Sequence, residues 1–324
     1  MIRLEDVAVS FGHRQILERL SFHVADGEKV ALVGSNGTGK TTILKLLTGE
    51  LEPDLGMVQR PAERVCHIPQ HISSTGARAY STTALKFLLS ARELDRISRR
   101  IREIESRLES GEGSHHELEE LEELHELFLA NEGYRAEADI RQLLDGVGLD
   151  RVGLDRAVSS LSGGQRTKLM LCHMLYRKSD VLLLDEPTNH IEPTVVVWLA
   201  TYLAGLRKTV IAVSHNPAFL DIFVKRIISL EGTPTKARSY RGNYSDFLQQ
   251  KSTRELSEQR QQTNLRDEID RQEMFIRDAS QHQVGLMRAR EKSVERLKRG
   301  CRKQDPFAKP RSTFQSRFRF LGPR

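Results

Sequence analysis

The sequence contains few cysteines: there are three among 324 residues, Cys66, Cys172 and Cys301. None of them belongs to a CxxC pair, and an odd number of cysteines cannot pair completely. This usage does not indicate a zinc site or a disulfide framework, and it favours a reducing compartment.

Long apolar runs are also missing. The longest, such as residues 181–184, hold a few residues, whereas a helix that crosses a bilayer needs roughly 20. The first residues do not show the basic stretch followed by an apolar one that marks a secretory signal. These absences predict a soluble, cytoplasmic protein with no transmembrane segment of its own. Such a protein could still dock on a membrane partner.

Charge is unevenly distributed along the chain, whose net charge is +6. Residues 245–324 contain 19 lysines and arginines against 11 acidic residues, so a nearly neutral remainder carries a basic C-terminal segment. Such asymmetry favours a polyanionic partner, most often nucleic acid. The alternative is a solvated helix in a highly charged protein.

The hydrophobic pattern changes between strand and helix. Apolar runs at 29–33, 181–184, 210–213 and 227–230 predict strands, and their alternation with helices implies a largely parallel sheet and an α/β fold. Between residues 83 and 144 the pattern is helical, and Gly111 to Ser114 interrupt it, so two helices should pack antiparallel. The first helix has a coiled-coil stripe made of Leu94, Ile97, Ile101, Ile104 and Leu108.

A long, charged helical segment is predicted after Tyr244. Residues 245–299 are polar and favour helix, with so few apolar positions that we expect a hairpin that turns near 278–285 and projects from the globular part. Beyond Gly300 the composition is rich in Arg, Phe and Pro, and a disordered tail is predicted for 300–324. The expected domains are 1–243, with a helical subdomain at about 81–175, followed by a linker hairpin at 244–299.

A glycine-rich loop directly follows the strand predicted at 29–33 and matches GxxxxGK[ST]. Its glycines let backbone N–H groups surround phosphates, and the next helix offers them its positive end. Lys40 supplies a charge for the β- and γ-phosphates and Thr41 a hydroxyl for Mg²⁺. In this context an ATP-binding (Walker A) loop is favoured over a plain glycine turn. Its residues are Gly34, Ser35, Asn36, Gly37, Thr38, Gly39, Lys40, Thr41 and Thr42.

The strand predicted at 181–184 ends in two carboxylates, Asp185 and Glu186. This arrangement is typical of a Walker B strand, in which Asp185 holds Mg²⁺ and Glu186 polarises the attacking water. An acidic pair on the surface is the alternative.

A third motif, LSGGQR, occupies residues 161–166, twenty residues before the acidic strand. We predict a helix from Thr167 to Leu175 that Ser162 caps. Gly163 and Gly164, followed by Gln165, then allow close backbone approach to an anion.

In this order the three motifs resemble an ATP-binding cassette (ABC) domain over roughly residues 1–243. The resemblance implies an ABC-type P-loop ATPase fold with a helical subdomain. It also implies that Phe11 stacks on adenine, that Gln70 reaches Mg²⁺ and water, and that His215 contacts the γ-phosphate. The alternatives are that Phe11 is a core residue, Gln70 a loop residue and His215 a strand-end cap. Because ATP in this family lies between the Walker A loop of one cassette and the LSGGQ helix of another, hydrolysis is expected to need a homodimer or a second cassette.

Two further features resemble the ABC-F family of translation-associated ATPases. Residues 189–192 read NHIE, where that family has NHLD, and Glu192 keeps the charge on a longer arm. Residues 240–247 and the charged helix after them resemble the ABC-F exit into the linker between cassettes. The resemblance implies a ribosome or tRNA partner. One face of the predicted linker helix carries four basic residues, Arg288, Lys292, Arg296 and Arg299. This face suits contact with RNA phosphates. The alternative is that these residues pair with acidic residues of the same helix.

Several alternatives stay open. ABC-F proteins usually contain two cassettes, so this chain is either a half-protein or a truncated two-cassette protein. A nucleotide-binding subunit of a transporter and a fragment that binds ATP without turnover are competing hypotheses. The sequence does not distinguish translation control, antibiotic protection and ribosome assembly, or ATP from GTP.

Overall fold

The computed structural model describes residues 1–60, 65–70, 81–189, 191–232, 234–278 and 293–296. The chain divides into two units, Met1–Leu248 and Gln249–Arg324, which are described separately. Among the residues predicted to contact RNA, Arg296 is described, whereas Arg288, Lys292 and Arg299 lie outside the described residues. The predicted hairpin turn and the 300–324 tail also lie outside them.

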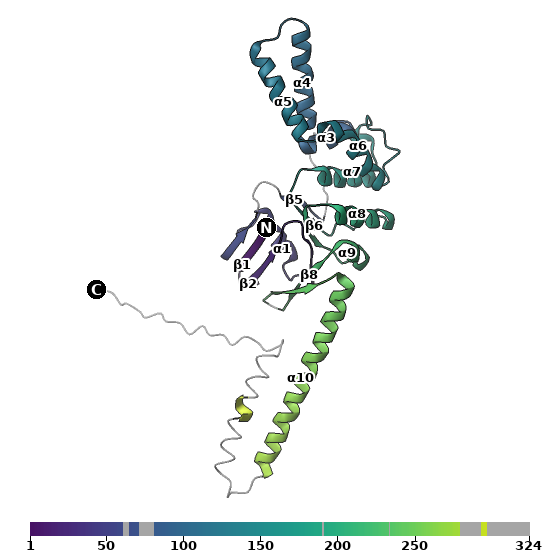
Figure 1. Ribbon diagram of the computed structural model, residues 1–324. Coiled ribbons are helices and arrows are strands. Elements are labelled where there is room, and N and C mark those ends of the chain that lie inside the picture. The colour runs from purple at the N-terminus through teal and green to yellow at the C-terminus, as the bar shows by residue number, and fades with distance from the viewer. Residues whose placement is uncertain (61–64, 71–80, 190, 233, 279–292, 297–324) are drawn as a thin grey trace, which may run out of the picture. The chain divides into compact units, whose positions relative to one another are not determined.

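A six-stranded sheet forms the centre of the first unit (Figure 1). The strand order is β5-β6-β7-β3-β8-β9, and every neighbouring pair is parallel except β8 and β9. The predicted α/β fold with a largely parallel sheet is therefore confirmed. The strands are β3 (Lys29–Gly34), β5 (Val65–Ile68), β6 (Val181–Asp185), β7 (Thr209–Val213), β8 (Arg226–Glu231) and β9 (Lys236–Arg241).

A three-stranded antiparallel sheet and helix α1 (Lys40–Thr48) cover one face of the central sheet. Its strand order is β2-β1-β4, with β1 at Ile2–Phe11, β2 at Arg14–Val24 and β4 at Leu55–Gln59. Helix α1 buries its apolar side chains in a cluster that includes residues of both sheets. This packing fixes the start of α1 beside the end of β3.

Helices cover the opposite face. In β3, Val30 and Leu32 belong to the α1 side, whereas Ala31 and Val33 belong to the second cluster, as the two-residue period of a strand requires. The second cluster includes residues of α7 (Gly163–Tyr176), α8 (Pro193–Gly205) and α9 (Pro217–Phe223).

The segment predicted as a helical subdomain contains α3 (Ala84–Leu89), α4 (Leu94–Glu109), α5 (His115–Ala130), α6 (Ala136–Gly146) and α7. We call the LSGGQ motif at residues 161–165 the signature motif and α7 the signature helix. Short 3₁₀ turns lie at Ser90–Arg92, Gly133–Arg135 and Val158–Ser160. Helix α7 begins at Gly163, four residues earlier than predicted. The reason is a capping box between Ser162 and Gln165, which makes the two glycines part of the first turn.

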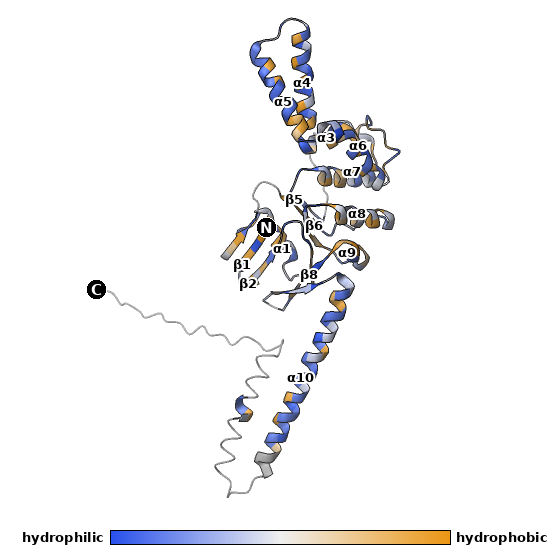
Figure 2. Cartoon of the chain, viewed as in Figure 1, coloured by the Kyte–Doolittle hydropathy of each residue, from blue (hydrophilic) through white to orange (hydrophobic). Residues whose placement is uncertain are grey.

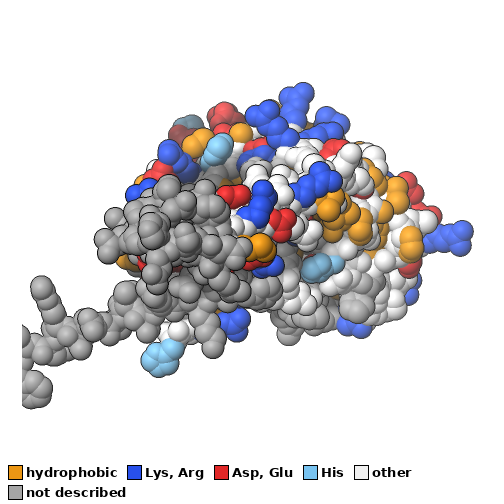
Figure 3. All heavy atoms as spheres, turned by 90° about the horizontal axis from the view of Figure 1, so that it is seen from below, with side chains coloured by type: hydrophobic (Ala, Val, Ile, Leu, Met, Phe, Trp, Pro, Cys, Tyr) orange, Lys and Arg blue, Asp and Glu red, His pale blue; other side chains and the backbone are white. Residues whose placement is uncertain are grey.

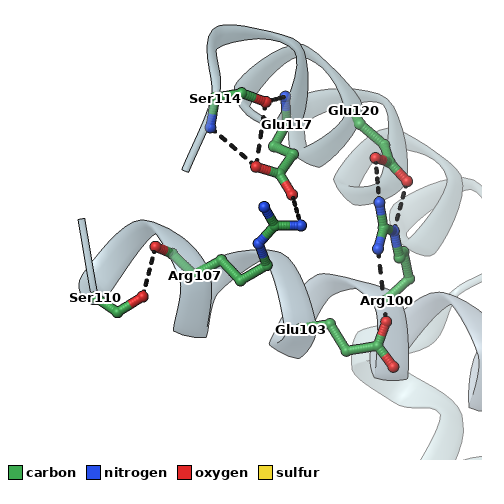
Figure 4. Close-up of polar contacts among 7 residues, drawn as sticks. All are labelled: Arg100, Glu103, Arg107, Ser110, Ser114, Glu117 and Glu120. Carbon is green, nitrogen blue, oxygen red and sulfur yellow. Dashed lines mark hydrogen bonds and ion pairs between the residues drawn. The ribbon is translucent and has the colours of Figure 1, made fainter. Parts of the chain in front are cut away.

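Helices α4 and α5 form an antiparallel hairpin, in which hydrophilic and hydrophobic positions follow one another along both helices (Figure 2). The stripe Leu94, Ile97, Ile101 and Ile104 of α4 is buried. Arg100 makes two hydrogen bonds of 2.7 Å to the carboxylate of Glu120, and Arg107 lies 2.8 Å from Glu117 (Figure 4). Glu117 also accepts a hydrogen bond from the backbone N–H of Ser114 and completes the capping box of α5. Ion pairs therefore supplement a narrow apolar stripe.

Helix α10 spans Tyr244–Asp278 and continues into the second unit. Reciprocal hydrogen bonds between Asn243 and Asp246 satisfy the first N–H groups of the helix, which explains why it starts at this motif. Arg254 pairs along the helix with Glu258 at 2.7 Å.

On the face drawn in Figure 3, basic and acidic side chains are interspersed. Within the described ranges, no helix is both long enough and apolar enough to cross a bilayer.

Candidate nucleotide-binding site

A pocket of about 610 Å³ lies where α1 begins and where β6 and β7 end. The carboxyl ends of parallel strands are the usual place for ligands in an α/β sheet. Most of the predicted site residues line this pocket, although they come from distant parts of the chain. They are Phe11, Asn36, Gly37, Gly39, Lys40, Thr41, Thr42, Gln70, Asp185, Glu186 and His215.

Two glycines of the Walker A loop are required by its geometry. Gly39 has a φ of 89°, and a Cβ there would lie 2.9 Å from side-chain carbons of Ile16 and Leu17. A Cβ at Gly34 would lie 2.7 Å from Thr38 Oγ1 and 2.9 Å from the Leu230 carbonyl oxygen. The loop can therefore turn sharply into α1 only because these positions lack side chains.

Hydrogen bonds within the Walker A loop hold its shape. Thr38 Oγ1 donates to the carbonyl of Ser35 at 2.9 Å. Lys40 Nζ donates to the carbonyls of Gly34 and Ser35 at 2.7 and 3.1 Å. Burial lowers the pKa of Lys40, whereas the nearby charge of Glu186 opposes this change. The loop thus holds a partly desolvated ammonium group at the start of a helix, where anions are favoured.

Thr41 and Asp185 connect the two phosphate-site motifs. Thr41 Oγ1 donates to Asp185 Oδ2 at 3.1 Å, and Asp185 is buried at the end of β6. A hydroxyl and a carboxylate at this separation fit a Mg²⁺ ion, which takes oxygen ligands and usually keeps waters and substrate phosphates as the others. The two residues therefore satisfy the donor chemistry that the predicted metal site needs.

Glu186 is held in a strained conformation with a φ of 51°, which non-glycine residues adopt rarely. Its own N–H donates to the Val213 carbonyl at 2.8 Å, so the turn is anchored to β7. The backbone N–H of His215 donates to Glu186 Oε2 at 3.2 Å. Glu186 Oε1 lies 3.4 Å from His215 Nε2 without a hydrogen bond to it or to another described residue. One carboxylate oxygen is thus oriented, and the other remains available to accept a proton.

Phe11 and Gln70 also line the pocket. Phe11 is 53% exposed at the end of β1, so it is not a core residue, and its ring is accessible for stacking. Gln70 follows β5. Sequence reasoning missed four lining residues, because only the fold brings them here: Arg14, Ile16, Asn189 and Val213.

The signature residues do not line this pocket. Ser162 Oγ accepts from the Gln165 N–H at 3.2 Å, and Gln165 Oε1 accepts from the Ser162 N–H at 3.0 Å. Gly163 and Gly164 are exposed, with open space around the positions of their missing side chains. The N-terminal end of this helix is therefore exposed and does not belong to the pocket of its own chain.

Comparison with known protein families supports the interpretation of this pocket as an ATP-binding site. A family model described as ABC transporter matches residues 17–189, and a second model with the same description matches residues 230–320. The chain is 32% identical over 274 residues to the tylosin resistance ATP-binding protein TlrC of Streptomyces fradiae, covering 83% of this chain and 49% of TlrC. It is 30% identical over 332 residues to ABC transporter F family member 5 of Arabidopsis thaliana, covering 98% of this chain and 46% of that protein. The chain spans about half the length of the curated relatives it matches.

Solved structures show the same fold. One described as the ATP-binding subunit of an ABC transporter has a TM-score of 0.55 at 19% identity, covering 78% of this chain and 93% of that chain. At this identity the likeness concerns the fold alone.

Proposed function

Because this chain belongs to the ATP-binding cassette (ABC) transporter family, we propose that it is an ATPase of the ABC-F type that acts on ribosome-bound RNA. ATP binds in the pocket described above, and a second cassette supplies the signature helix that completes the site. One observation carries this proposal: Lys40, Thr41, Asp185 and Glu186 share one pocket, whereas the chain's own signature residues 162–165 do not line it.

Each part of the nucleotide has a partner of suitable chemistry. The exposed ring of Phe11 stacks on the base, and aromatic stacking of this kind tolerates either purine. The N–H groups at the start of α1 and the Lys40 ammonium hold the phosphates. Mg²⁺, held by Thr41 and Asp185, supplies neutralisation of phosphate charge when it is bound.

Glu186 and His215 act on the water that attacks the γ-phosphate. The oriented Glu186 carboxylate accepts a proton from this water, and the His215 imidazole, 3.4 Å from Oε1, contacts the γ-phosphate. Gln70 approaches the same region from the end of β5. In phosphoryl transfer such positioning supplies most of the catalysis, since the protein forms no covalent intermediate.

The proposed RNA contact rests on charge. Arg254 and Arg271 of α10 pair with acidic residues of the same helix, so they add little net charge. From residue 277 onward there are 14 lysines and arginines against 4 acidic residues, and this excess favours binding to phosphates. Arg288, Lys292, Arg296 and Arg299 are the proposed contacts. Translation control, antibiotic protection and ribosome assembly are all compatible with this role.

Ribosome co-sedimentation tests the proposal. The Glu186→Gln variant keeps the shape of the side chain and removes the proton acceptor, so it should bind ATP, remain closed and pellet with ribosomes only when ATP is present. Pelleting should weaken as salt rises, because phosphate contacts release counterions. Lys40→Ala is the matched control that should not respond to ATP.

A Glu186→Gln protein that binds ATP but never pellets would contradict the ribosomal role. Co-purification with a membrane-spanning partner would instead support a transporter subunit. Unchanged ATP turnover in Glu186→Gln would contradict the role of Glu186.

A further inference from the structure

An ion pair connects the signature helix to the segment that follows the Walker B strand. Lys168 Nζ, on α7, lies 3.1 Å from both carboxylate oxygens of Glu192. Glu192 occupies the N-cap position of α8, where a Ser, Thr, Asp or Asn side chain usually accepts a hydrogen bond from the first turn. Here it makes no such cap and reaches α7 instead. The contact thus joins two elements that carry the two halves of the composite ATP site.

Two backbone hydrogen bonds shape the chain that follows Glu186. The Asn189 N–H donates to the Glu186 carbonyl at 3.2 Å, and the Ile191 N–H donates to the Thr188 carbonyl at 3.4 Å. Asn189 also lines the nucleotide pocket. A displacement of this segment by bound nucleotide is therefore passed directly to Glu192.

Lys168 lies on the same helix as the residues that meet the other cassette. It is one residue beyond Thr167, whose hydroxyl donates to the Gly163 carbonyl at 3.1 Å in the first turn of α7. The ammonium also lies 3.9 Å from the position of a Cβ at Gly148, after α6. Moving Lys168 therefore moves the N-terminal end of α7, because a helix turn is stiff.

A second contact near the ion pair is apolar and holds α6 against α8. The Trp198 indole of α8 rests on Gly146 at the end of α6, where any side chain would collide with it. Glu192 and Trp198 lie at the beginning and in the middle of α8. The helical segment thus meets α8 through apolar packing as well as through the ion pair, and the ion pair is the contact that a small movement can break.

The exposure of the Lys168–Glu192 pair indicates that it positions the two helices rather than stabilising the fold. Lys168 is 16% exposed, but Glu192 is 67% exposed, and ion pairs in such surroundings add little to folding. The helices are held by buried residues such as Leu169 and Leu199. Removing the charge should therefore leave the fold intact while freeing the end of α7.

We propose that the Lys168–Glu192 ion pair is a positioning contact that couples the nucleotide pocket of one cassette to its own signature helix. Through it, ATP bound in one chain sets the place at which Ser162–Gln165 meet the ATP of the second cassette. The inference rests on the proposed composite site. Glu192 matters by its length: aspartate is shorter by one C–C bond, roughly 1.5 Å, and would not reach Lys168 without movement of the loop.

The test uses Lys168→Met, which keeps the apolar stem, Glu192→Gln, and the charge-reversed double variant Lys168→Glu with Glu192→Lys. Arg141→Met is the matched control, because Arg141 pairs with Glu137 within α6 and joins no second element. Hydrogen exchange is measured over residues 160–170 in the protein without nucleotide. ATP-dependent dimerisation is then measured in the Glu186→Gln background, together with binding of a fluorescent ATP analogue.

We expect faster exchange over residues 160–170 in both single variants, and dimerisation that needs about fivefold more protein or more. ATP-analogue affinity should stay within about twofold of that of the unchanged protein. The double variant should restore exchange and dimerisation, and Arg141→Met should change neither. Unchanged exchange in both single variants overturns the inference. If the Glu186→Gln background itself never dimerises with ATP, the composite site is wrong, while the exchange result still decides the role of the ion pair.

Discussion

Thr41 and Asp185 are 144 positions apart in the sequence, yet Thr41 Oγ1 donates a 3.1 Å hydrogen bond to Asp185 Oδ2. This bond joins the first turn of α1 to the end of β6. It places a hydroxyl and a carboxylate where a divalent cation would contact both of them and the phosphates.

Substituting Thr41→Val removes the hydroxyl and keeps the shape of the side chain. ATP affinity in the presence of Mg²⁺ should fall about tenfold, since a hydrogen bond or ligand to a charged group is lost. Affinity in the presence of EDTA should change little. Titration with a fluorescent ATP analogue measures both, and Thr48→Val, at the other end of α1, is the control. Equal losses with and without Mg²⁺ would contradict the metal role.

Gly39→Ala and Gly37→Ala form a matched pair. Both glycines have positive φ, 89° and 83°, so alanine is strained at either position, by about 1–3 kcal/mol. Only at Gly39 would the new Cβ also collide with Ile16 and Leu17, whereas Gly37 has open space. Thermal unfolding should therefore show the larger loss of stability for Gly39→Ala. A larger loss at Gly37 would contradict this description of the loop.

His173 makes stability depend on pH in the mildly acidic range. Burial lowers the pKa of His173 from 6.5 to about 4, and its ring stacks on Phe87 with centroids 4.4 Å apart. The folded state thus favours the neutral ring. Its contribution is present above pH 6.5 and is lost as the pH falls towards 4, by at most about 3 kcal/mol.

Denaturant unfolding at several pH values checks this dependence. The His173→Gln variant should have lower stability at pH 7 and a flatter pH profile between 6.5 and 4. A profile as steep as that of the unchanged protein would assign the pH dependence to other groups.

The α4–α5 hairpin should loosen at low pH. The hydrogen bond from Arg100 holds the pKa of Glu120 below its usual value of 4.5. Stability from this pair is present above that value and is lost as the pH falls through the lowered pKa. Proteolysis or hydrogen exchange of the hairpin should therefore increase as the pH falls below 4.5.

Glu120→Gln should loosen the hairpin already at neutral pH. Glu119→Gln serves as its control, because Glu119 is more exposed than Glu120 and lies 3.8 Å from His115 of the same helix. Equal protection of the hairpin in the two variants at pH 7 would show that the Arg100–Glu120 pair is not needed.

Much of the fold was predictable because short apolar runs identify buried parallel strands. Strand β9 was missed, because its largely polar sequence at Lys236–Arg241 lacks the apolar run that marks the buried strands. The start of α7 was predicted too late, because glycines disfavour helices and the capping box between Ser162 and Gln165 outweighs this preference.

The phosphate-binding part of the site was also predictable, because its residues are adjacent in sequence. Arg14 and Asn189 were not predicted to line the pocket, since only the folding of β2 and the 186–192 segment brings them there. The contact between Lys168 and Glu192 depends on the packing of two helices and has no local sequence signal.

Complementation between two inactive variants tests the composite ATP site most directly. Lys40→Ala disables the phosphate loop and keeps the signature helix, whereas Gly164→Asp adds a repelling charge at an open position of the signature and keeps the loop. Each variant alone should lack ATP turnover, but a mixture should recover part of it, because one site of the mixed dimer is intact. Turnover by either variant alone at the rate of the unchanged protein, or a mixture with no more turnover than its components, would contradict the account.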